Sequence, residues 1–402
     1  MGSYAGPDVS ESGLVLALDG ANYKSFKGEA TTNELVAVNW AGDGVDQASF
    51  TKGTVSVTDE SLKYKGYETY LWSPGASLNC YLYSTSLSTL RTSTVWTFSC
   101  YVKREDGAAI TSLSVYMYYP NSDGAAAGTI EDVGNGWYRV SRTRTGADNY
   151  LSLVGFTGFA ANTKYYLSGA QLEKKSYATT PTTTNTTRGT TVATGGGWAD
   201  LTGRGNNGTV SGISYNSSNG GSLSFDGTSA YVTCGTLSGS FASFTIITWF
   251  YPTVVVNYNN VLDGNSNYYT SGNVGPRLEM DSSGNLAWVY SNNTTDGNQF
   301  YVHRILNSGL AANTWHYVVI TYDGGSNTST TYYNGNATGI SRILVGTPTG
   351  FVGSMNSLNI GRGFGSSRYF QGRISQTQIY SRALTASEIQ QNFNASRGRY
   401  GI

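Results

Sequence analysis

The chain has 402 residues, with 25 Lys and Arg against 25 Asp and Glu, so its formal net charge is zero. This balance argues against nucleic-acid binding or membrane-surface binding driven by bulk electrostatics. Only 12% of the residues are charged while 13% are aromatic, and the chain contains 51 Gly and 31 Tyr. Such a composition favours strands and turns and disfavours a helical bundle or a Rossmann-type enzyme. The length predicts two domains.

Alternating apolar and polar residues predict strands along most of the chain. Residues 13–19 alternate in this way and run into a turn-rich stretch at 20–28. Further strands are expected at 54–58, 95–102, 113–119, 136–142 and 165–172 in the first half, and at 222–225, 244–250, 286–290, 315–322, 357–360 and 376–380 in the second. The Thr-rich stretch at 178–188 between the two sets is the clearest linker.

One helix is expected near the C-terminus. Thr385 and Glu388 fit a capping box, and Leu384 and Ile389 fit the hydrophobic staple that accompanies it. The helix should therefore begin at Thr385, run for about 12 residues and pack on a β-sandwich. Gly398 is expected to end it in a left-handed conformation.

The three cysteines, Cys80, Cys100 and Cys234, have no CxxC spacing and are interpreted as small buried apolar residues rather than a disulfide framework or a zinc site. The first 14 residues lack a basic start followed by an apolar run, and no apolar stretch reaches 18 residues. We therefore expect a soluble protein made in the cytosol, without membrane insertion.

Catalytic motifs are weak. Glu279 and Asp281 could face one side of a strand, but a Ser-Ser-Gly turn follows where a third carboxylate would be needed for glycoside hydrolysis. The two histidines, His303 and His316, lie in alternating strands and are interpreted as structural. The Gly-rich stretch at 361–365 has no strand-to-helix context, so we do not expect it to bind phosphate. The sequence therefore predicts a protein that is not an enzyme and needs no cofactor.

Residues 220–235, 313–324 and 372–389 in the second half resemble laminin G-like, concanavalin A-like lectin domains. The last of these stretches is a strand that passes through an Arg-Ala-Leu turn into a Ser-x-Glu-Ile helix start. Residues 13–26 resemble the first strand of the same domain, which in similar phage proteins soon runs into a Trp-x-Asp-Leu-x-Gly segment; here that segment is 198–203. The lectin-like domain is therefore expected to be interrupted by an insertion.

The inserted block resembles the carbohydrate-binding-module-like jelly rolls of phage tail and virion proteins. The resemblance rests on residues 96–103, 136–140 and 165–173. The expected fold is all-β, with two antiparallel β-sandwich or jelly-roll domains, one inserted into the other, and one short C-terminal helix. The expected segments are 1–30 for the N-terminal part and first strand of the lectin-like domain, 31–187 for the inserted jelly roll and 188–402 for the remainder.

The resemblance also raises the question of a calcium site. Many laminin G-like domains bind calcium, and relatives usually carry aspartates after Gly-Arg-Ile, where this chain has Ser375 and Gln376. A calcium site at these positions is therefore not expected, and only Asp226 and Asp263 with nearby Asn side chains remain as alternative ligands.

Sugar binding is the activity that the resemblance implies, because sugar C–H faces stack on exposed aromatic rings. The candidate residues are aromatics in turn-rich stretches, Tyr70, Trp72, Tyr258, Tyr268 and Tyr269. The tryptophans of alternating strands are instead expected in the core; they are Trp96, Trp137, Trp249, Trp288 and Trp315.

Together the two resemblances imply a bacteriophage virion protein. The leading hypothesis is a non-enzymatic surface protein of the tail or fibre that contacts host-surface glycans. The alternative is a capsid-decorating or cementing protein, and a glycan depolymerase ranks third. The expected partners are other virion proteins and host glycans but not nucleic acid, the expected assembly is a homo-oligomer such as a trimer, and the expected location is the virion exterior after synthesis in the host cytoplasm.

Overall fold

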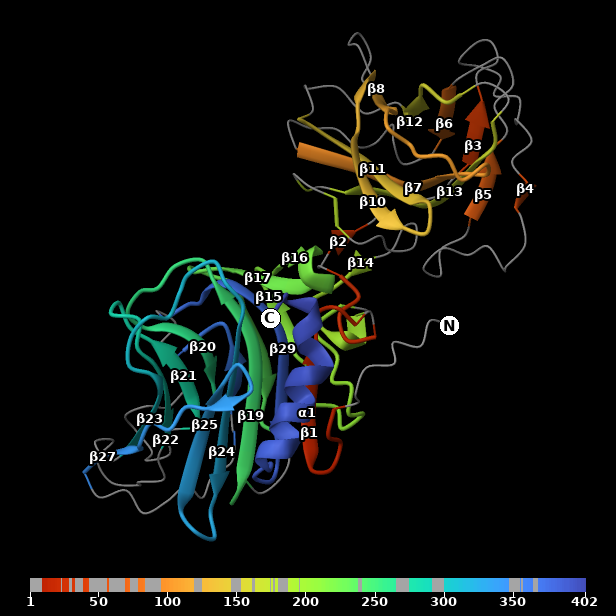
Figure 1. The fold of residues 1–402 in the computed structure, drawn as a ribbon. Coiled ribbons are helices and arrows are strands. Elements are labelled where there is room, and N and C mark those ends of the chain that lie inside the picture. Colours follow the sequence, from red (N-terminus) through yellow and green to blue (C-terminus); the bar gives the residue numbers. More distant parts are fainter. Residues whose placement is uncertain are drawn as a thin grey trace. The chain divides into compact units, whose positions relative to one another are not determined.

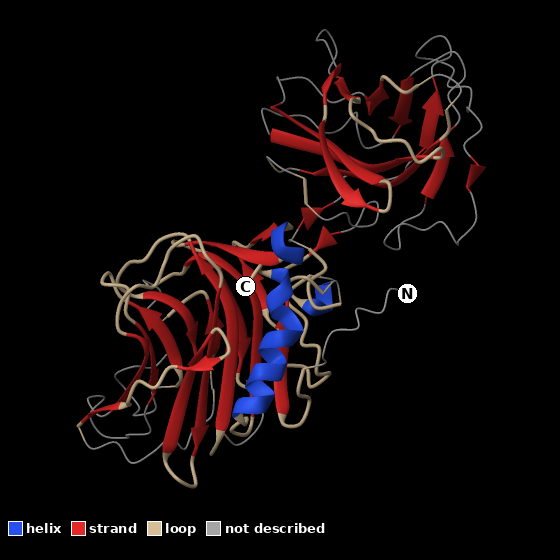
Figure 2. Cartoon of the chain, viewed as in Figure 1, coloured by secondary structure: helices blue, strands red, loops and turns tan. Residues whose placement is uncertain are grey.

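The computed structural model describes residues 9–22, 24–28, 31–32, 39–42, 56–57, 69–72, 79–83, 95–118, 125–145, 153–160, 163–173, 175, 178–179, 187–194, 196–237, 241–264, 275–290, 300–346, 355, 357–363 and 368–402. Strands dominate this part of the chain, and its one α-helix is α1 (Ala386–Ser396) (Figure 2). The prediction of an all-β fold with a short C-terminal helix is confirmed.

The chain divides into two compact units. Unit 1 combines Met1–Glu29 with Gly189–Ile402, and unit 2 is Ala30–Arg188. Each unit has its own antiparallel sheets (Figure 1) and its own hydrophobic core.

Unit 1 is a sandwich of two eight-stranded antiparallel sheets. The first sheet has the order β16 (Ser214–Asn216), β17 (Ser222–Asp226), β29 (Gln371–Tyr380), β19 (Phe244–Pro252), β24 (His316–Asp323), β25 (Thr328–Tyr333) and β26 (Asn336–Ala337), with β1 (Leu14–Asp19) also paired to β29. The second has the order β15 (Thr209–Ser211), β18 (Tyr231–Gly235), β28 (Leu358–Ile360), β20 (Asn259–Asp263), β21 (Arg277–Met280), β22 (Leu286–Tyr290), β23 (Phe300–Leu306) and β27 (Ile343–Val345). One core cluster takes side chains from both sheets, so their inner faces pack together.

Segments before and after unit 2 build the same part of unit 1. Strand β1 pairs with the C-terminal half of β29, whereas β17 pairs with its N-terminal half. The Ser25 hydroxyl donates to the Ala199 carbonyl over 2.6 Å, and the Ala17 amide donates to the Asp200 carboxylate over 3.1 Å. The described residues before unit 2 are thus an integral part of this sandwich.

The C-terminus closes over the outer face of the first sheet. Thr385 is the N-cap of α1 and forms the predicted capping box with Glu388, and Leu384 and Ile389 are both buried. The prediction that Gly398 ends the helix in a left-handed conformation is wrong: a 3₁₀ turn, Arg397–Arg399, continues instead, and the positive φ lies at Gly401.

Tertiary contacts explain why the chain continues past Gly398. The Arg399 guanidinium donates to both oxygens of the Asp19 carboxylate, at 3.0 to 3.1 Å, and the Tyr400 ring stacks 4.0 Å from the Trp249 ring. These contacts tie the end of the chain to β1 and to the sheet, and they favour the continued turn over a left-handed stop.

Unit 2 has two further antiparallel sheets. One has the order β10 (Thr129–Gly134), β11 (Trp137–Thr145), β7 (Val95–Arg104), β13 (Tyr165–Glu173), β5 (Thr69–Trp72) and β4 (Ser56–Val57). The other has the order β3 (Asn39–Gly42), β6 (Asn79–Tyr83), β12 (Leu153–Thr157), β8 (Ser114–Tyr118) and β9 (Ala125–Ala127). Both sheets contribute to one core cluster.

The entry and exit of unit 2 are adjacent. Strand β2 (Thr31–Thr32) pairs with β14 (Thr187–Arg188), so the two crossing points lie side by side. Near the exit, the buried Glu173 carboxylate accepts hydrogen bonds from Gln171 and from the backbone and side chain of Thr179. These bonds hold the start of the Thr-rich stretch against the sheet.

The core predictions hold for cysteine and tryptophan. Cys80, Cys100 and Cys234 are buried and unpaired as thiols, and burial raises the pKa of each. The tryptophans expected in the core are all buried; they are Trp96, Trp137, Trp249, Trp288 and Trp315. Among the described residues, no helix has the length and apolar character needed to span a bilayer.

Candidate functional site

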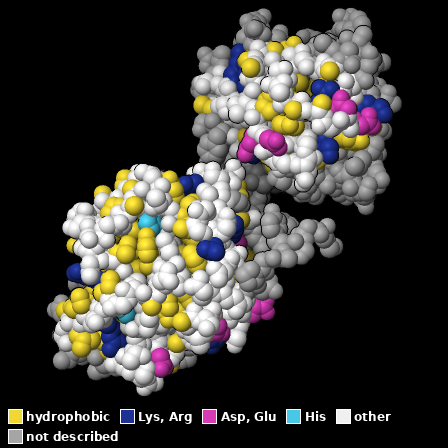
Figure 3. All heavy atoms as spheres, viewed as in Figure 1, with side chains coloured by type: hydrophobic (Ala, Val, Ile, Leu, Met, Phe, Trp, Pro, Cys, Tyr) yellow, Lys and Arg dark blue, Asp and Glu magenta, His cyan; other side chains and the backbone are white. Residues whose placement is uncertain are grey.

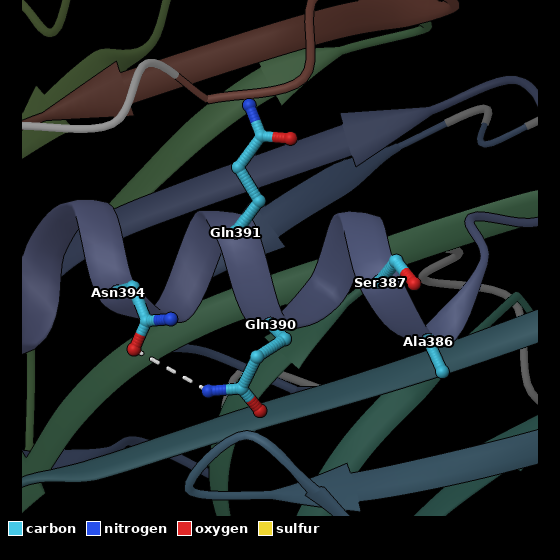
Figure 4. A pocket seen from close by; sticks show the side chains of 5 residues that line it. All are labelled: Ala386, Ser387, Gln390, Gln391 and Asn394. Atoms are coloured by element: carbon cyan, nitrogen blue, oxygen red, sulfur yellow. Dashed lines mark hydrogen bonds between the residues drawn. The ribbon is translucent and has the colours of Figure 1, made fainter.

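A hollow beside α1 is lined by Ala386, Ser387, Gln390, Gln391 and Asn394 (Figure 4). None of these side chains titrates, and the Gln390 amide donates to the Asn394 amide oxygen over 3.3 Å. The hollow offers neither an acid, a base nor an aromatic ring. This hollow therefore has no side chain suited to catalysis or to stacking on a sugar.

Acidic residues at the end of β21 are engaged in structural contacts. Oε2 of Glu279 lies 2.8 Å from Arg277 Nε and 4.0 Å from Arg368 Nη1; the shorter contact is an ion pair without hydrogen-bond geometry. The Asp281 carboxylate accepts from the Ser283 amide and from Asn285, as expected for a polar turn. Burial works to raise the pKa of Asp281, but these hydrogen bonds outweigh it and hold the pKa below its usual value.

Both histidines are buried and hydrogen-bonded. His303 contacts the Ile340 carbonyl through Nε2 and the Ser329 hydroxyl through Nδ1, at 2.7 and 2.9 Å. His316 contacts the Ala311 carbonyl through Nε2 at 2.8 Å and the Tyr333 hydroxyl through Nδ1 at 2.8 Å. Burial lowers the pKa of each ring, so the neutral form is favoured, with Nε2–H donating to the carbonyl.

These pKa shifts predict a loss of stability in mild acid. Because the folded pKa values of His303 and His316 lie below the unfolded value of about 6.5, the unfolded state takes up protons first. The stabilisation is complete above about pH 6.5 and is lost as the pH falls toward the lower folded values. We expect the urea midpoint of unit 1 to fall between about pH 7.5 and 5.5 and this slope to flatten in His303→Gln and His316→Gln. An unchanged slope in the double variant would contradict the assignment.

A metal site would need several ligand side chains close together. Within the described ranges, no three His, Cys, Asp or Glu side chains gather where they could hold a metal ion. The Asp226 carboxylate accepts from the amides of Thr228, Ser229 and Ala230 and from two hydroxyls, which outweigh its partial burial and lower its pKa. Asp263 lies opposite Arg277 in the β20–β21 register.

The predicted sugar-binding aromatics have different environments. Trp72 is only 4% exposed and lies in the core of unit 2, so its prediction as an exposed ring is wrong: it alternates inward on β5. Tyr70 lies on the same side of β5 and packs partly against this core. Tyr258 is 55% exposed. Tyr268 and Tyr269 lie outside the described residues.

Tyr258 lies beside a hairpin that leads from β28 to β29. The Gly361 amide donates to the Val261 carbonyl, the Phe370 amide to the Gly361 carbonyl, and the Gly363 amide to the Arg368 carbonyl, all at 2.8 or 2.9 Å. Arg362 and Tyr369 lie directly opposite each other across this hairpin. Since Arg368 precedes Tyr369 by one residue, its side chain leaves from the other face of the hairpin.

Each face of this hairpin carries an arginine stacked on a tyrosine. On one face the Arg362 guanidinium lies 3.6 Å from the centre of the Tyr231 ring, and the Tyr369 ring lies 6.5 Å from Tyr231. On the other face the Arg368 guanidinium lies 3.9 Å from the centre of the Tyr258 ring. Stacking of this kind holds both partners in place. We call the set Tyr231, Tyr258, Arg362, Arg368 and Tyr369 the hairpin site.

Sequence reasoning found one member of the hairpin site, Tyr258, and missed the other four. The stretch at 361–365 was considered only as a phosphate loop, although its Arg between two Gly, followed by an Arg-Tyr pair at 368–369, was the available signal. On the face of unit 1 seen in Figure 3, charged side chains are scattered among hydrophobic and uncharged ones rather than gathered in a patch.

A protein-family comparison finds a match within unit 1. Residues 226–390 match the model described as the concanavalin A-like lectin/glucanases superfamily. These residues are therefore similar to concanavalin A-like lectin/glucanase domains. The matched range of this lectin-like domain contains every residue of the hairpin site.

Solved structures align with about half of the chain. Domain 4 of an extracellular arabinanase from Geobacillus stearothermophilus, solved in complex with arabinotriose, is 19% identical, with a TM-score of 0.39 over 48% of this chain and 91% of that domain. The receptor-binding domain of botulinum neurotoxin type G is 17% identical, with a TM-score of 0.35 over 49% of this chain and 48% of that domain. A pentraxin from Limulus polyphemus is 17% identical, with a TM-score of 0.32 over 42% of this chain and 78% of that one. No curated protein matches the sequence.

Proposed function

We propose that this chain is a glycan-binding structural module, carried on the exterior of a bacteriophage virion as part of a tail or fibre. The observation that carries the glycan-binding step is the hairpin site within the lectin-like domain: a 55% exposed Tyr258 ring held by Arg368, with Tyr231, Arg362 and Tyr369 on the other face of the same hairpin. The virion placement rests on the resemblance of the sequence to phage proteins.

The chemistry of the site suits a sugar. An exposed tyrosine offers an apolar face to sugar C–H groups, and guanidinium groups beside it offer several N–H donors to hydroxyl oxygens. A single contact of this kind adds about 0.5 to 1.5 kcal/mol. Useful affinity would therefore come from several copies acting together, as in a homo-oligomer such as a trimer.

The proposal is that this module binds without cleaving. At the edge of the site, Oε2 of Glu279 lies 2.8 Å from Arg277 Nε and 4.0 Å from Arg368 Nη1, so this carboxylate is engaged in ion pairs. Asp281 is occupied by its own turn, and both histidines bond to backbone carbonyls. Release of reducing ends from a bound glycan would overturn this part of the proposal.

A glycan array tests the binding function. We expect the full chain to capture a subset of microbial glycans and Tyr258→Ala to lose at least about twofold of that signal, because it removes the exposed ring. Leu344→Ala is the matched control, since Leu344 is similarly exposed, at 58%, but lies on β27 at the far edge of the second sheet. Equal losses in both variants, or no capture by the wild type, would overturn the proposal.

The alternative function, a capsid-decorating or cementing subunit, has one observation in its favour. Strand β27 is the last strand of the second sheet in the described residues, and its Ile343 and Leu344 are exposed. An apolar edge strand is a usual place for pairing with another chain. If this function holds, the chain should bind particles of its phage with no glycan captured, and Leu344→Lys should weaken that binding.

A further inference from the structure

We infer that the hairpin site selects acidic glycans and that Arg362 receives their anionic group. This inference rests on the proposed glycan binding and narrows it to one class of ligand. The shared chemistry is an anionic substituent, either a carboxylate or a sulfate, on a sugar whose ring lies against the neighbouring tyrosines.

The Arg362 guanidinium is held in one orientation by protein contacts. Its face lies on the Tyr231 ring at 3.6 Å, and its Nη2 donates to the Asn359 amide oxygen over 2.9 Å. Asn359 is itself held, because its Nδ2 donates to the Ser357 carbonyl over 2.8 Å. A guanidinium fixed in this way loses little conformational freedom when a ligand binds.

The remaining donors of Arg362 are available. Its Nε and Nη1 make no hydrogen bond within the described residues, and the side chain is half-buried rather than covered. Nη2 keeps a second N–H besides the one donated to Asn359, and this N–H together with that of Nε or Nη1 matches the two oxygens of a carboxylate or sulfate in a bidentate arrangement. A neutral sugar hydroxyl would occupy only one of these donors.

Two carboxylates, Glu279 and Asp263, lie in the strands next to the hairpin. Glu279 lies near Arg368, at 4.0 Å, and against Arg277, at 2.8 Å. Asp263 lies opposite Arg277 on one neighbouring strand and opposite Asn359, the partner of Arg362, on the other. No carboxylate in the described residues forms an ion pair with Arg362, so its positive charge is not neutralised by the protein. An incoming anion would supply the missing counter-charge at a site partly shielded from water.

The tyrosines on the Arg362 face provide a contact for the acidic sugar unit, in addition to the Tyr258 contact on the other face of the hairpin. The Tyr369 ring lies 6.5 Å from Tyr231 at an interplanar angle of 52°, so one ring supports the guanidinium while the other stands beside it. A sugar with its anionic group on Arg362 would rest its C–H face on Tyr369. The site therefore fits a uronic-acid-like, sialic-acid-like or sulfated sugar.

The test compares acidic and neutral glycans with two arginine variants of the full chain. Arg373→Gln is a matched control for Arg362→Gln: Arg373 lies 3.9 Å over the Tyr251 ring and donates to the Asn216 side chain, but it belongs to the first sheet. We expect the array to show capture of acidic glycans, and Arg362→Gln to reduce it at least tenfold while Arg373→Gln leaves it unchanged. Arg362→Lys, which keeps the charge but not the planar fork, should retain part of the signal.

Varying the salt concentration and the charge of the glycan distinguishes the possible outcomes. Capture should weaken as salt rises from about 0.05 to 0.5 M, because the contact is ionic. Carboxylated and sulfated array members, each beside its uncharged counterpart, identify which anion is bound. Capture of neutral glycans alone, or equal losses in Arg362→Gln and Arg373→Gln, would overturn this inference and leave glycan binding standing. No capture of any glycan would instead overturn the proposed function itself, and this inference with it.

Discussion

Replacement of Trp198 by alanine is expected to lower the free energy of unfolding of unit 1 by about 3 to 5 kcal/mol. Trp198 is 0% exposed and lies in the core cluster between the two sheets. Its backbone exchanges two 2.7 Å hydrogen bonds with Gly208 and forms a bridge with Phe26, a residue from before unit 2. Its loss leaves a cavity where the two separated parts of the chain meet. Since a domain of this kind has about 5 to 15 kcal/mol of stability in total, at least about a fifth of it would be lost.

Urea unfolding measured by circular dichroism tests this expectation, with hydrogen exchange locating the affected region. Amides of β1, β17 and β29 should lose protection, whereas those of β7, β11 and β13 in unit 2, which has a separate core, should not. Leu201→Ala is the control in the same segment, because Leu201 is 39% exposed and should change stability by less than about 0.5 kcal/mol. A loss below about 1 kcal/mol for Trp198→Ala would show that the N-terminal segment docks only loosely.

The elements that could be predicted from sequence are those set by local rules. A capping box acts over four residues, so Thr385 and Glu388 located the helix start to the residue. Period-2 alternation located the strands and assigned tryptophans such as Trp249 and Trp288 to the interior. The helix end was missed because it depends on Asp19 and Trp249, which contact Arg399 and Tyr400 only in the folded chain.

Sequence patterns along one strand do not predict which of its two faces points to the core. Tyr70 and Trp72 are two residues apart on β5, so they share a face, but the pattern alone does not say which face points to the core. The hairpin site was hard to find for a related reason. Its pairs, Tyr231 with Arg362 and Tyr258 with Arg368, come from distant parts of the sequence and meet only because β18, β28 and β20 are neighbours in the second sheet.

Introducing a methyl group at Gly363 is expected to disable the whole hairpin site at once. A Cβ atom there would lie 1.7 Å from Nδ2 and 2.6 Å from Cγ of Asn260, distances that real contacts do not reach, and 3.0 Å from its Cβ. Asn260 is fully buried and cannot move aside. Gly363→Ala should therefore displace the hairpin that carries Arg362 and Arg368, at a cost of about 1 to 3 kcal/mol in stability, and reduce glycan capture at least tenfold.

Gly398→Ala provides the matched comparison, because a Cβ at Gly398 meets nothing within 4 Å and its φ is not in the left-handed region. It should leave both stability and glycan capture unchanged. The double variant Gly363→Ala with Asn260→Ala removes the amide that the new methyl group would strike, so it should recover part of the capture lost in Gly363→Ala alone. Such recovery would show that the loss comes from the position of the hairpin and not from general unfolding. Full capture by Gly363→Ala would instead mean that glycans bind at a surface that does not depend on this hairpin.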